Sequence, residues 1–270
     1  MANESEESNS MSEMIGVAVP IAKEVHKILK DRGVYEKAMD YLARRKPKDI
    51  IVLGASGTGK SSFLKSIRGL SAYIRPEDRT DKATKVKGKI GKEFFNFIDT
   101  PGEAQHKAKR SQVLYEIYGK PFLGIINLVS YGYHENAIAG THAIAGTSAS
   151  ETYLESRRQT EINQLAEWTS LLAGRGGPAK WLITVVTKAD LWWSPTNAPI
   201  VLEYYKTGKY WGALGEATEI TYSVRSYSSL NQLFYGRAAM SGFYTDTQRV
   251  RDRSSLIALL LEYCIDQPKK

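Results

Sequence analysis

The chain has 270 residues, of which 42% are hydrophobic and 24% charged, a balance that permits a packed core and argues against global disorder. Its 37 Lys and Arg against 29 Asp and Glu give a net charge of +8, which allows an anionic partner such as nucleic acid, phosphate or lipid without demonstrating one. The single cysteine excludes an internal disulfide framework and argues against a Cys-built zinc site. We expect a soluble cytoplasmic protein, because the apolar stretches are far shorter than the roughly 20 residues of a spanning helix and the first residues are acidic.

The first part of the chain differs in composition from the rest. Residues 1–13 are polar and acidic and predict a disordered tail. Apolar residues then recur at helical spacing on both sides of Gly33, which predicts a helical extension over residues 14–47. Its apolar stripe could lie on an anionic membrane, but docking onto the next domain or a partner is favoured because the stripe is short. Residues 267–270 are expected to form a second tail.

From residue 48 onward, short apolar runs alternate with helical segments. Most runs are rich in β-branched residues, as in strands buried on both faces of a parallel sheet. We expect strands at Lys48–Leu53, Lys85–Lys89, Phe94–Ile98, Phe122–Val129, Trp181–Val186 and Ile220–Ser226. We expect helices from Lys60 to about Arg68 and over Ala104–Tyr118, Glu151–Ala173, Ala198–Lys206 and Leu256–Ile265. The alternation predicts an α/β three-layer fold, with a mostly parallel central sheet and helices on both faces, over residues 48–266.

Residues 130–150 interrupt this alternation as an inserted loop. Ala-Ile-Ala-Gly-Thr occurs in it twice, beginning at Ala137 and at Ala143, yet two copies cannot make a solenoid. Its Gly, Ala and Ser content predicts a long loop, with Glu135 as its one fixed charge. Because the loop leaves the carboxyl end of a predicted strand, we expect it on the functional face. It is either mobile until a partner or a second copy orders it, or folded permanently over its own domain.

A phosphate-binding pattern follows the first predicted strand. Gly54-Ala-Ser-Gly-Thr-Gly-Lys-Ser61 matches G-x-x-x-x-G-K-[ST] between a strand and a helix. In such a loop the backbone N–H groups point at phosphate oxygens, and the helix dipole adds positive potential. The lysine supplies charge for the β- and γ-phosphates, and the Ser61 hydroxyl suits Mg²⁺. The predicted nucleotide-binding residues here are Gly54, Ser56, Gly57, Thr58, Gly59, Lys60, Ser61 and Ser62.

Two more motifs come directly after predicted strands. In Asp-Thr-Pro-Gly, the Asp99 carboxylate can hold a Mg²⁺ water and the Gly102 amide can reach a γ-phosphate. In Thr-Lys-Ala-Asp, beginning at Thr187, the Asp190 carboxylate can accept the two N–H groups of guanine that adenine lacks. The stem of Lys188 can cover the face of the base. Each motif alone is weak, but three in this order predict a GTP site.

Together these motifs resemble those of P-loop GTPases of the translation-factor, Ras and septin class. The Thr-Lys-Ala-Asp form resembles that of ribosome-assembly GTPases of the EngB type. The resemblance covers residues 48–265 and implies a Ras-like G domain that binds GTP and GDP with Mg²⁺ and hydrolyses GTP. It also implies a switch threonine, for which Thr80 is the candidate and Thr84 the alternative, and a last base-contacting segment at residues 226–229. It assigns Lys60, Thr80 and Gly102 to catalysis and Ser61, Thr80 and Asp99 to the metal.

One position departs from the family. Glu103 stands where many relatives carry a glutamine that orients the attacking water, and a γ-phosphate repels a carboxylate there. Gln105 and His106 are nearby substitutes, but exposed positions at a helix start explain them more simply. We therefore expect slow hydrolysis without a partner. Arg157 and Arg158 could supply a guanidinium across a dimer, although a solvated helix face is the simpler interpretation.

Two other functions stay open, a dimerising GTP-dependent scaffold with little hydrolysis and an ATP-using P-loop enzyme. Glu103 keeps the first open, and Asp190 argues against the second. The expected partner is an unidentified protein or a second copy of the chain, while RNA and an anionic membrane have no motif in their support. The lysines of Lys85–Lys89 are better explained by protection of an exposed sheet edge than by RNA binding.

Overall fold

The structure is a computed structural model. It describes residues 24–31, 34, 48–70, 84–90, 93–100, 124–135, 142–173, 179–214 and 220–265.

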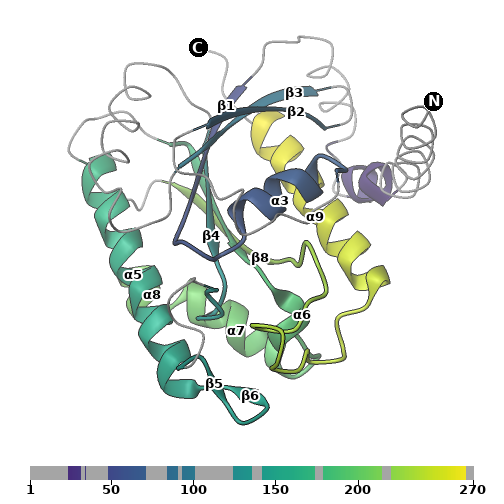
Figure 1. The fold of residues 1–270 in the computed structure, drawn as a ribbon. Helices are drawn as coiled ribbons and strands as arrows, with labels where there is room; N and C mark the ends of the chain where they lie inside the picture. Colours follow the sequence, from purple (N-terminus) through teal and green to yellow (C-terminus); the bar gives the residue numbers. More distant parts are fainter. Residues whose placement is uncertain are drawn as a thin grey trace, which may run out of the picture.

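Among the described residues, a six-stranded sheet has the order β2-β3-β1-β4-β7-β8 (Figure 1). Its strands are β1 (Lys48–Gly54), β2 (Thr84–Ile90), β3 (Glu93–Asp99), β4 (Gly124–Val129), β7 (Trp181–Val186) and β8 (Thr221–Ser226). Neighbouring strands are parallel except β2 and β3, so the mostly parallel sheet predicted from the sequence is confirmed. Lys85 and Lys87 of the edge strand β2 are exposed, as expected for residues that protect a sheet edge.

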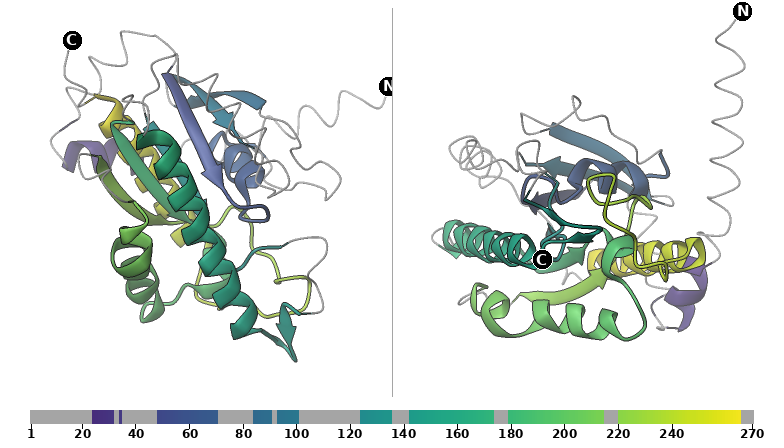
Figure 2. Two further views of the ribbon diagram at one scale, coloured as in Figure 1. Left: turned by 90° about the vertical axis from the view of Figure 1, so that its left-hand side faces the viewer. Right: turned by 60° about the horizontal axis from the view of Figure 1, so that its bottom comes forward.

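Helices lie on both sides of the sheet (Figure 2). The described helices are α3 (Lys60–Ile67), α5 (Glu151–Ala173), α6 (Ala189–Trp192), α7 (Asn197–Lys206), α8 (Gly208–Gly212) and α9 (Asp246–Ile265). The closing helix was predicted too short: α9 begins at Asp246 rather than Leu256, because its first turns are polar and carry no apolar stripe. The expected helix Ala104–Tyr118 lies outside the described residues.

Alternate residues of β1 divide between two apolar clusters. Ile50 and Val52 pack on one face with residues of α3 and α9. Ile51 and Leu53 pack on the other face with residues of α5, α7 and α8. A sheet with helices packed on each face is the three-layer fold that the sequence predicts.

The helical segment over residues 24–31 docks on the face that α3 and α9 cover. Val25 and Leu29 are buried in the same cluster as α3 and α9, while His26 faces solvent. Docking onto the domain is therefore confirmed for this segment. The remainder of the predicted extension, apart from residue 34, and both predicted tails lie outside the described residues. Within the part of the chain that the structure describes, no helix combines the length and apolar character needed to cross a membrane.

The predicted inserted loop contains a small hairpin, which corrects the expectation of a segment without secondary structure. β5 (Ile144–Ala145) pairs with β6 (Ser148–Ala149), and strands of two residues are too short to show alternation in the sequence. Ala143, just before the hairpin, is fully buried and packs in a cluster with Tyr153 and Phe234. This part of the insertion folds over its own domain. Residues 136–141, which hold the whole first repeat copy, lie outside the described residues.

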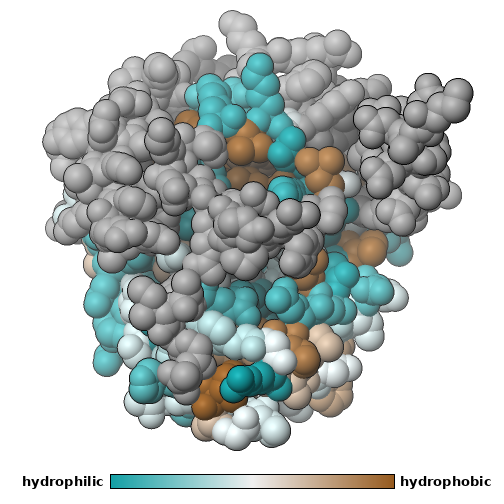
Figure 3. All heavy atoms as spheres, in the orientation of Figure 1, coloured by the Kyte–Doolittle hydropathy of each residue, from teal (hydrophilic) through white to brown (hydrophobic). Residues whose placement is uncertain are grey.

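The described surface shows no single apolar face in the view of Figure 3, where hydrophobic residues are scattered among hydrophilic ones. Among the described residues, large exposed apolar side chains occur after α3, on α7 and α8, and between β8 and α9. They are Leu70, Ile200, Trp211, Leu233, Met240 and Phe243.

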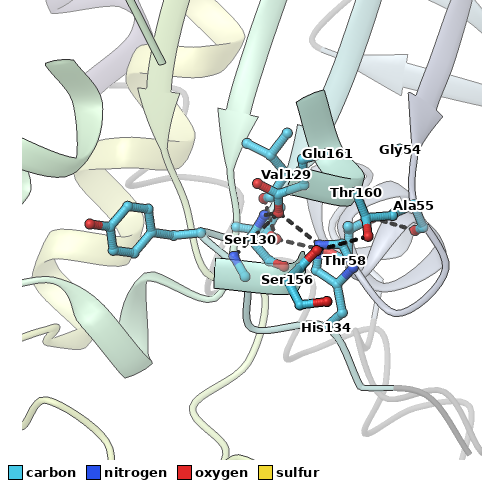
Figure 4. A network of polar contacts seen from close by, with 12 residues as sticks. Gly54, Ala55, Thr58, Val129, Ser130, His134, Ser156, Thr160 and Glu161 are labelled. Atoms are coloured by element: carbon cyan, nitrogen blue, oxygen red, sulfur yellow. Dashed lines mark hydrogen bonds and ion pairs between the residues drawn. The ribbon is translucent and has the colours of Figure 1, made fainter. Parts of the chain in front are cut away.

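A buried carboxylate fixes the segment that follows β4 (Figure 4). Glu161 of α5 is 3% exposed, and its Oε1 accepts the Ser130 N–H at 2.8 Å and lies 2.7 Å from His134 Nε2. Its Oε2 accepts the Tyr205 hydroxyl at 2.6 Å. Burial of a carboxylate is tolerable only with such donors, so α5 holds the start of the insertion in place. Sequence analysis gave His134 no role.

Gly124→Ala is expected to lower the free energy of unfolding by about 1–3 kcal/mol through overpacking. A methyl group there would lie 2.2 Å from the buried ring of Trp181. Gly212→Ala in α8 is the matched control, since nothing lies within 4 Å of the added methyl. Chemical denaturation measures both variants, and equal effects would contradict the packing of Trp181 over β4.

His134 is expected to make stability depend on pH. Burial lowers its pKa, opposed by the hydrogen bond to Glu161, so the folded chain keeps the ring neutral below its ordinary pKa. Below about pH 6.5 the unfolded chain takes up a proton that the folded chain does not. The free energy of unfolding therefore decreases as the pH is lowered. His134→Gln, whose amide can still donate to Glu161, should lose this component. Denaturant unfolding of both proteins between about pH 7.5 and 5.5 measures it; parallel pH dependences would contradict the assignment.

Candidate nucleotide-binding site

The loop between β1 and α3 turns at two glycines with positive φ. Gly57 and Gly59 have φ values of +79° and +88°, which favour glycine. A Cβ at Gly57 would lie 2.5 Å from the backbone oxygen of Glu135, whereas nothing lies within 4 Å of one at Gly59. The backbone at the N-terminus of α3 is therefore approachable by a ligand, and such N-termini favour phosphate.

Lys60 begins α3 and lies against this loop. Its side chain is buried, and Nζ donates to the carbonyl oxygens of Gly54 at 2.8 Å and Ala55 at 3.1 Å. The hydroxyl of the fully buried Thr58 also donates to Ala55, at 2.9 Å. The Lys60 ammonium therefore lies against the loop whose backbone is predicted to bind the phosphates. The predicted residues Ser56, Ser61 and Ser62 are half-buried at the same turn.

Thr187 joins the phosphate loop to the neighbouring strands. Its hydroxyl lies 2.7 Å from the Thr58 carbonyl oxygen and 2.9 Å from that of Val129, and its N–H donates to Val129 at 2.7 Å. Figure 4 places Thr58 beside Val129 and Ser130. Thr187, predicted to bind nucleotide, therefore braces the loop in this structure.

The predicted Mg²⁺ ligands Asp99 and Ser61 come from adjacent elements. Asp99 is the last residue of β3 and pairs in register with Val52 of the neighbouring strand β1, which leads into the phosphate loop. It is 2% exposed. Among the described residues, no three His, Cys, Asp or Glu side chains gather as a metal site. A hydroxyl and a carboxylate fit the preference of Mg²⁺ for oxygen ligands, which water and substrate phosphates complete.

Several predicted residues lie outside the described ranges: Thr80, Gly102, Glu103, Gln105 and His106. The alternative switch residue, Thr84, is the first residue of β2 and pairs with Asp99. It therefore belongs to a strand, whereas the resemblance assigns the switch threonine to a loop.

Asp190, in the first turn of α6, has a buried carboxylate with donors already in place. Oδ1 accepts the Ser228 hydroxyl at 2.5 Å, and Oδ2 accepts the Gln232 N–H at 2.9 Å. Burial raises the pKa of this carboxyl, opposed by these hydrogen bonds and by Lys188. An ionised carboxylate has about four acceptor positions, so it can accept further hydrogen bonding from the edge of a base. Ser228 falls within the predicted segment 226–229.

The segment with Ser228 is held by α9. The Tyr244 hydroxyl accepts the Ser228 N–H at 3.1 Å and donates to Asp252 at 3.0 Å. Ser226 donates to the same carboxylate at 2.9 Å. Sequence analysis missed Tyr244 and Asp252, because residues between β8 and the apolar part of α9 follow no periodic pattern.

Lys188 is bound to Glu135, a second residue that the motifs missed. Its Nζ lies 3.2 Å from Glu135 Oε2 and 5.6 Å from the centroid of the Phe234 ring. Among the described residues, the non-glycine residues with positive φ are Tyr131, Lys188 and Tyr235, and all three belong to the segments around this contact. Such conformations are strained and gather at functional sites. The sequence signals for Glu135 are its place in the loop that follows β4 and its being the one fixed charge of that loop.

The two arginines considered for a dimer contact are engaged within the chain. Arg158 is buried, pairs with Glu151 and lies 4.8 Å from the centroid of the Tyr131 ring. Arg157 lies 4.9 Å from the centroid of the Tyr153 ring. The interpretation as a solvated face is therefore wrong for Arg158, whose guanidinium packs on an aromatic ring.

Comparisons with known proteins found one family model and several solved structures to which the chain is similar. Residues 49–163 match the family model described as 50S ribosome-binding GTPase. A structure of the chloroplast translocon components atToc33 and psToc159 aligns at a TM-score of 0.50 and 15% identity, over 88% of this chain and 93% of that one. Toc33 from Arabidopsis thaliana with Mg²⁺ and GMPPNP aligns at 0.47 and 15%, over 88% and 94%. The mammalian SRP receptor aligns at 0.49 and 12%, over 80% and 100%. No curated protein sequence matches the chain significantly.

At these identities the structural likeness concerns the fold alone. It agrees with the sheet order around β1, the glycine-rich loop before α3 and the matched family model. The chain therefore has a Ras-like fold, with a mostly parallel sheet between helices, and residues 49–163 of it are similar to a GTPase family model.

Proposed function

We propose that the chain binds GTP with Mg²⁺ and hydrolyses it to GDP and phosphate, as a nucleotide-dependent switch or assembly factor. The observation that carries the proposal is the buried Asp190, oriented by Ser228 and Gln232. Thr187, from the same motif, bonds to the phosphate loop at Thr58. Because the base-edge acceptor and the phosphate loop are joined in this way, a single guanine nucleotide can bind both, the base at Asp190 and the phosphates at the loop.

Each proposed site residue has a distinct part in hydrolysis. Lys60 and the loop amides would stabilise charge on the β- and γ-phosphates as water attacks in line. Ser61, Thr80 and Asp99 would hold Mg²⁺, which supplies charge neutralisation between these phosphates. The Gly102 amide would donate to a γ-phosphate oxygen. Glu103 is a poor group for orienting the attacking water, which supports slow hydrolysis without a partner.

We also propose that the G domain spans residues 48–266, that it is related to EngB-type ribosome-assembly GTPases and that the protein acts in the cytoplasm. Dimerisation is important for the GTPase activity of atToc33 and psToc159, and a second copy of this chain is one candidate partner. The contacts of Arg158 within the chain give that candidate no support.

The direct test compares nucleotides. A fluorescent GTP analogue should be displaced by GTP and GDP and hardly by ATP, and GTP should yield phosphate in the presence of Mg²⁺. Equal displacement by ATP would favour the ATP-using alternative. GTP binding without phosphate release, with a nucleotide-dependent change in mass, would favour the dimerising scaffold.

Lys60→Ala is expected to weaken GTP binding by about a hundredfold or more, because the phosphates lose their main side-chain counter-charge. Titration calorimetry with GTP and Mg²⁺ measures the affinity. Lys180→Ala, at an exposed lysine, is the matched control and should bind like the parent. A thermal melt verifies folding, and a folded Lys60→Ala protein that binds GTP within a few-fold of the parent would contradict the phosphate-loop assignment.

Asp190→Asn is expected to change base preference by about a hundredfold or more in favour of xanthosine triphosphate over GTP. The amide replaces one acceptor with a donor, which suits the oxygen at that edge of xanthine and leaves a guanine donor unpaired. Competition binding with both nucleotides measures the ratio. The exposed Asp246→Asn provides the control, and an unchanged ratio in Asp190→Asn would remove this carboxylate from the base site.

A further inference from the structure

Glu135 touches three segments of the proposed nucleotide site. Its N–H donates to the Gly57 carbonyl in the phosphate loop at 3.4 Å. Its Oε1 accepts the Tyr235 N–H, between β8 and α9, at 2.8 Å. Its Oε2 lies 3.2 Å from Nζ of Lys188, between β7 and α6. One residue outside every motif therefore links the phosphate loop to both base-recognition segments.

The backbone that carries Glu135 is fixed from inside the domain. The preceding residue, His134, is 1% exposed, and its Nε2 lies 2.7 Å from the buried Glu161. The His134 carbonyl accepts the Tyr153 hydroxyl at 2.6 Å. Because both the ring and the carbonyl group of His134 are hydrogen-bonded, the backbone at Glu135 is held in place. A preorganised site requires side chains with such fixed backbone positions.

The Glu135 carboxylate orients the side chain of Lys188. The Lys188 and Glu135 side chains are only 17% and 28% exposed, so solvent screens their pairing less than that of a surface ion pair. The lysine backbone is left-handed, with φ of +53°, and its ammonium lies over the Phe234 ring. The tip of Lys188 is thus held, and its aliphatic stem is the part expected to cover a base.

The other carboxylate oxygen acts on the segment that supports Asp190. Tyr235 follows Gln232 closely in the chain, and the Gln232 N–H donates to Asp190. Holding the Tyr235 N–H therefore fixes the backbone whose amide orients the base-edge acceptor.

We propose that Glu135 is a positioning residue for guanine recognition, which holds Lys188 and the Tyr235 segment so that the Lys188 stem and Asp190 meet the base together. This role rests on the proposed function and deepens it. The contact with Gly57 is made by the Glu135 backbone, so changing the side chain leaves the phosphate loop its hydrogen bond.

Glu135→Gln tests this separation. The amide oxygen can still accept the Tyr235 N–H, but the negative charge beside the Lys188 ammonium is removed. We expect GTP affinity to fall about tenfold, while the affinity for inorganic tripolyphosphate, which has no base, stays unchanged. Calorimetry measures the first, and displacement of a fluorescent GTP analogue measures the second. Glu203→Gln, at an exposed glutamate that faces Lys206 at 3.9 Å, is the matched control and should change neither.

A double-mutant cycle tests whether Glu135 acts through Lys188. Lys188→Met alone should also lower GTP affinity, and the double variant should bind no more weakly than Lys188→Met, because the contact is already lost. Thermal melts verify folding of every variant. If Glu135→Gln does not fold, Lys188→Met measures the same contact from its other side, with GTP falling and tripolyphosphate unchanged.

Four results would overturn the proposal. Equal losses for GTP and tripolyphosphate would mean that Glu135 supports the phosphate loop instead. Additive losses in the cycle would mean that it acts independently of Lys188, and an unchanged GTP affinity would mean that it has no role in binding. A parent protein that binds no GTP would overturn the proposed function itself, a result distinct from the other three.

Discussion

The carbonyl groups near the carboxyl ends of neighbouring parallel strands set the geometry of the site. Near these ends, threonine residues donate to carbonyls of the neighbouring strand with the backbone N–H and add a side-chain hydroxyl. The Thr100 hydroxyl donates to Val52 at 2.9 Å, and the Thr187 hydroxyl lies within 2.9 Å of the carbonyls of Val129 and Thr58. The phosphate loop after β1 is thereby joined to the base motif after β7 by one buried threonine, and a shift of either segment would break its hydrogen bonds to the other.

Three buried or half-buried carboxylates hold segments that lack regular structure in a similar way, by side-chain hydrogen bonds to loop residues. Glu161 of α5 gathers donors from residues 130–134, Asp190 of α6 from Ser228 and Gln232, and Asp252 of α9 from Ser226 and Tyr244. A carboxylate can accept about four hydrogen bonds, so one side chain can hold several loop amides and hydroxyls at once. Helices that pack on the sheet thus fix loops that have little apolar surface of their own.

The sequence predicts those parts of the fold whose signal is local. Runs such as Trp181–Val186 and the helix Glu151–Ala173 have the predicted bounds, because β-branched content and length are properties of the segment itself. The first turns of α9, the short α6 and α8, and the β5–β6 hairpin give no such signal. They form because the domain around them supplies partners, as buried Ala143 does beneath the hairpin.

The same distinction holds for the site. Lys60, Asp99 and Asp190 belong to motifs with fixed spacing, whereas Glu135 reaches Lys188 across 53 residues and Tyr235 across 100. No spacing in one sequence encodes contacts of that range, since they depend on which strands become neighbours in the sheet. The position of Glu135 after a predicted strand indicates the correct edge of the sheet but not its partners.

The two lysines of the site lie beside different groups. Lys60 donates to the backbone carbonyls of Gly54 and Ala55 in the phosphate loop, and a phosphate is a stronger acceptor than either carbonyl. Lys188 faces the charged Glu135 in partly buried surroundings, and a neutral base cannot replace that charged partner. These contacts agree with the roles proposed for the two residues, phosphate binding for Lys60 and cover of the base by the stem of Lys188.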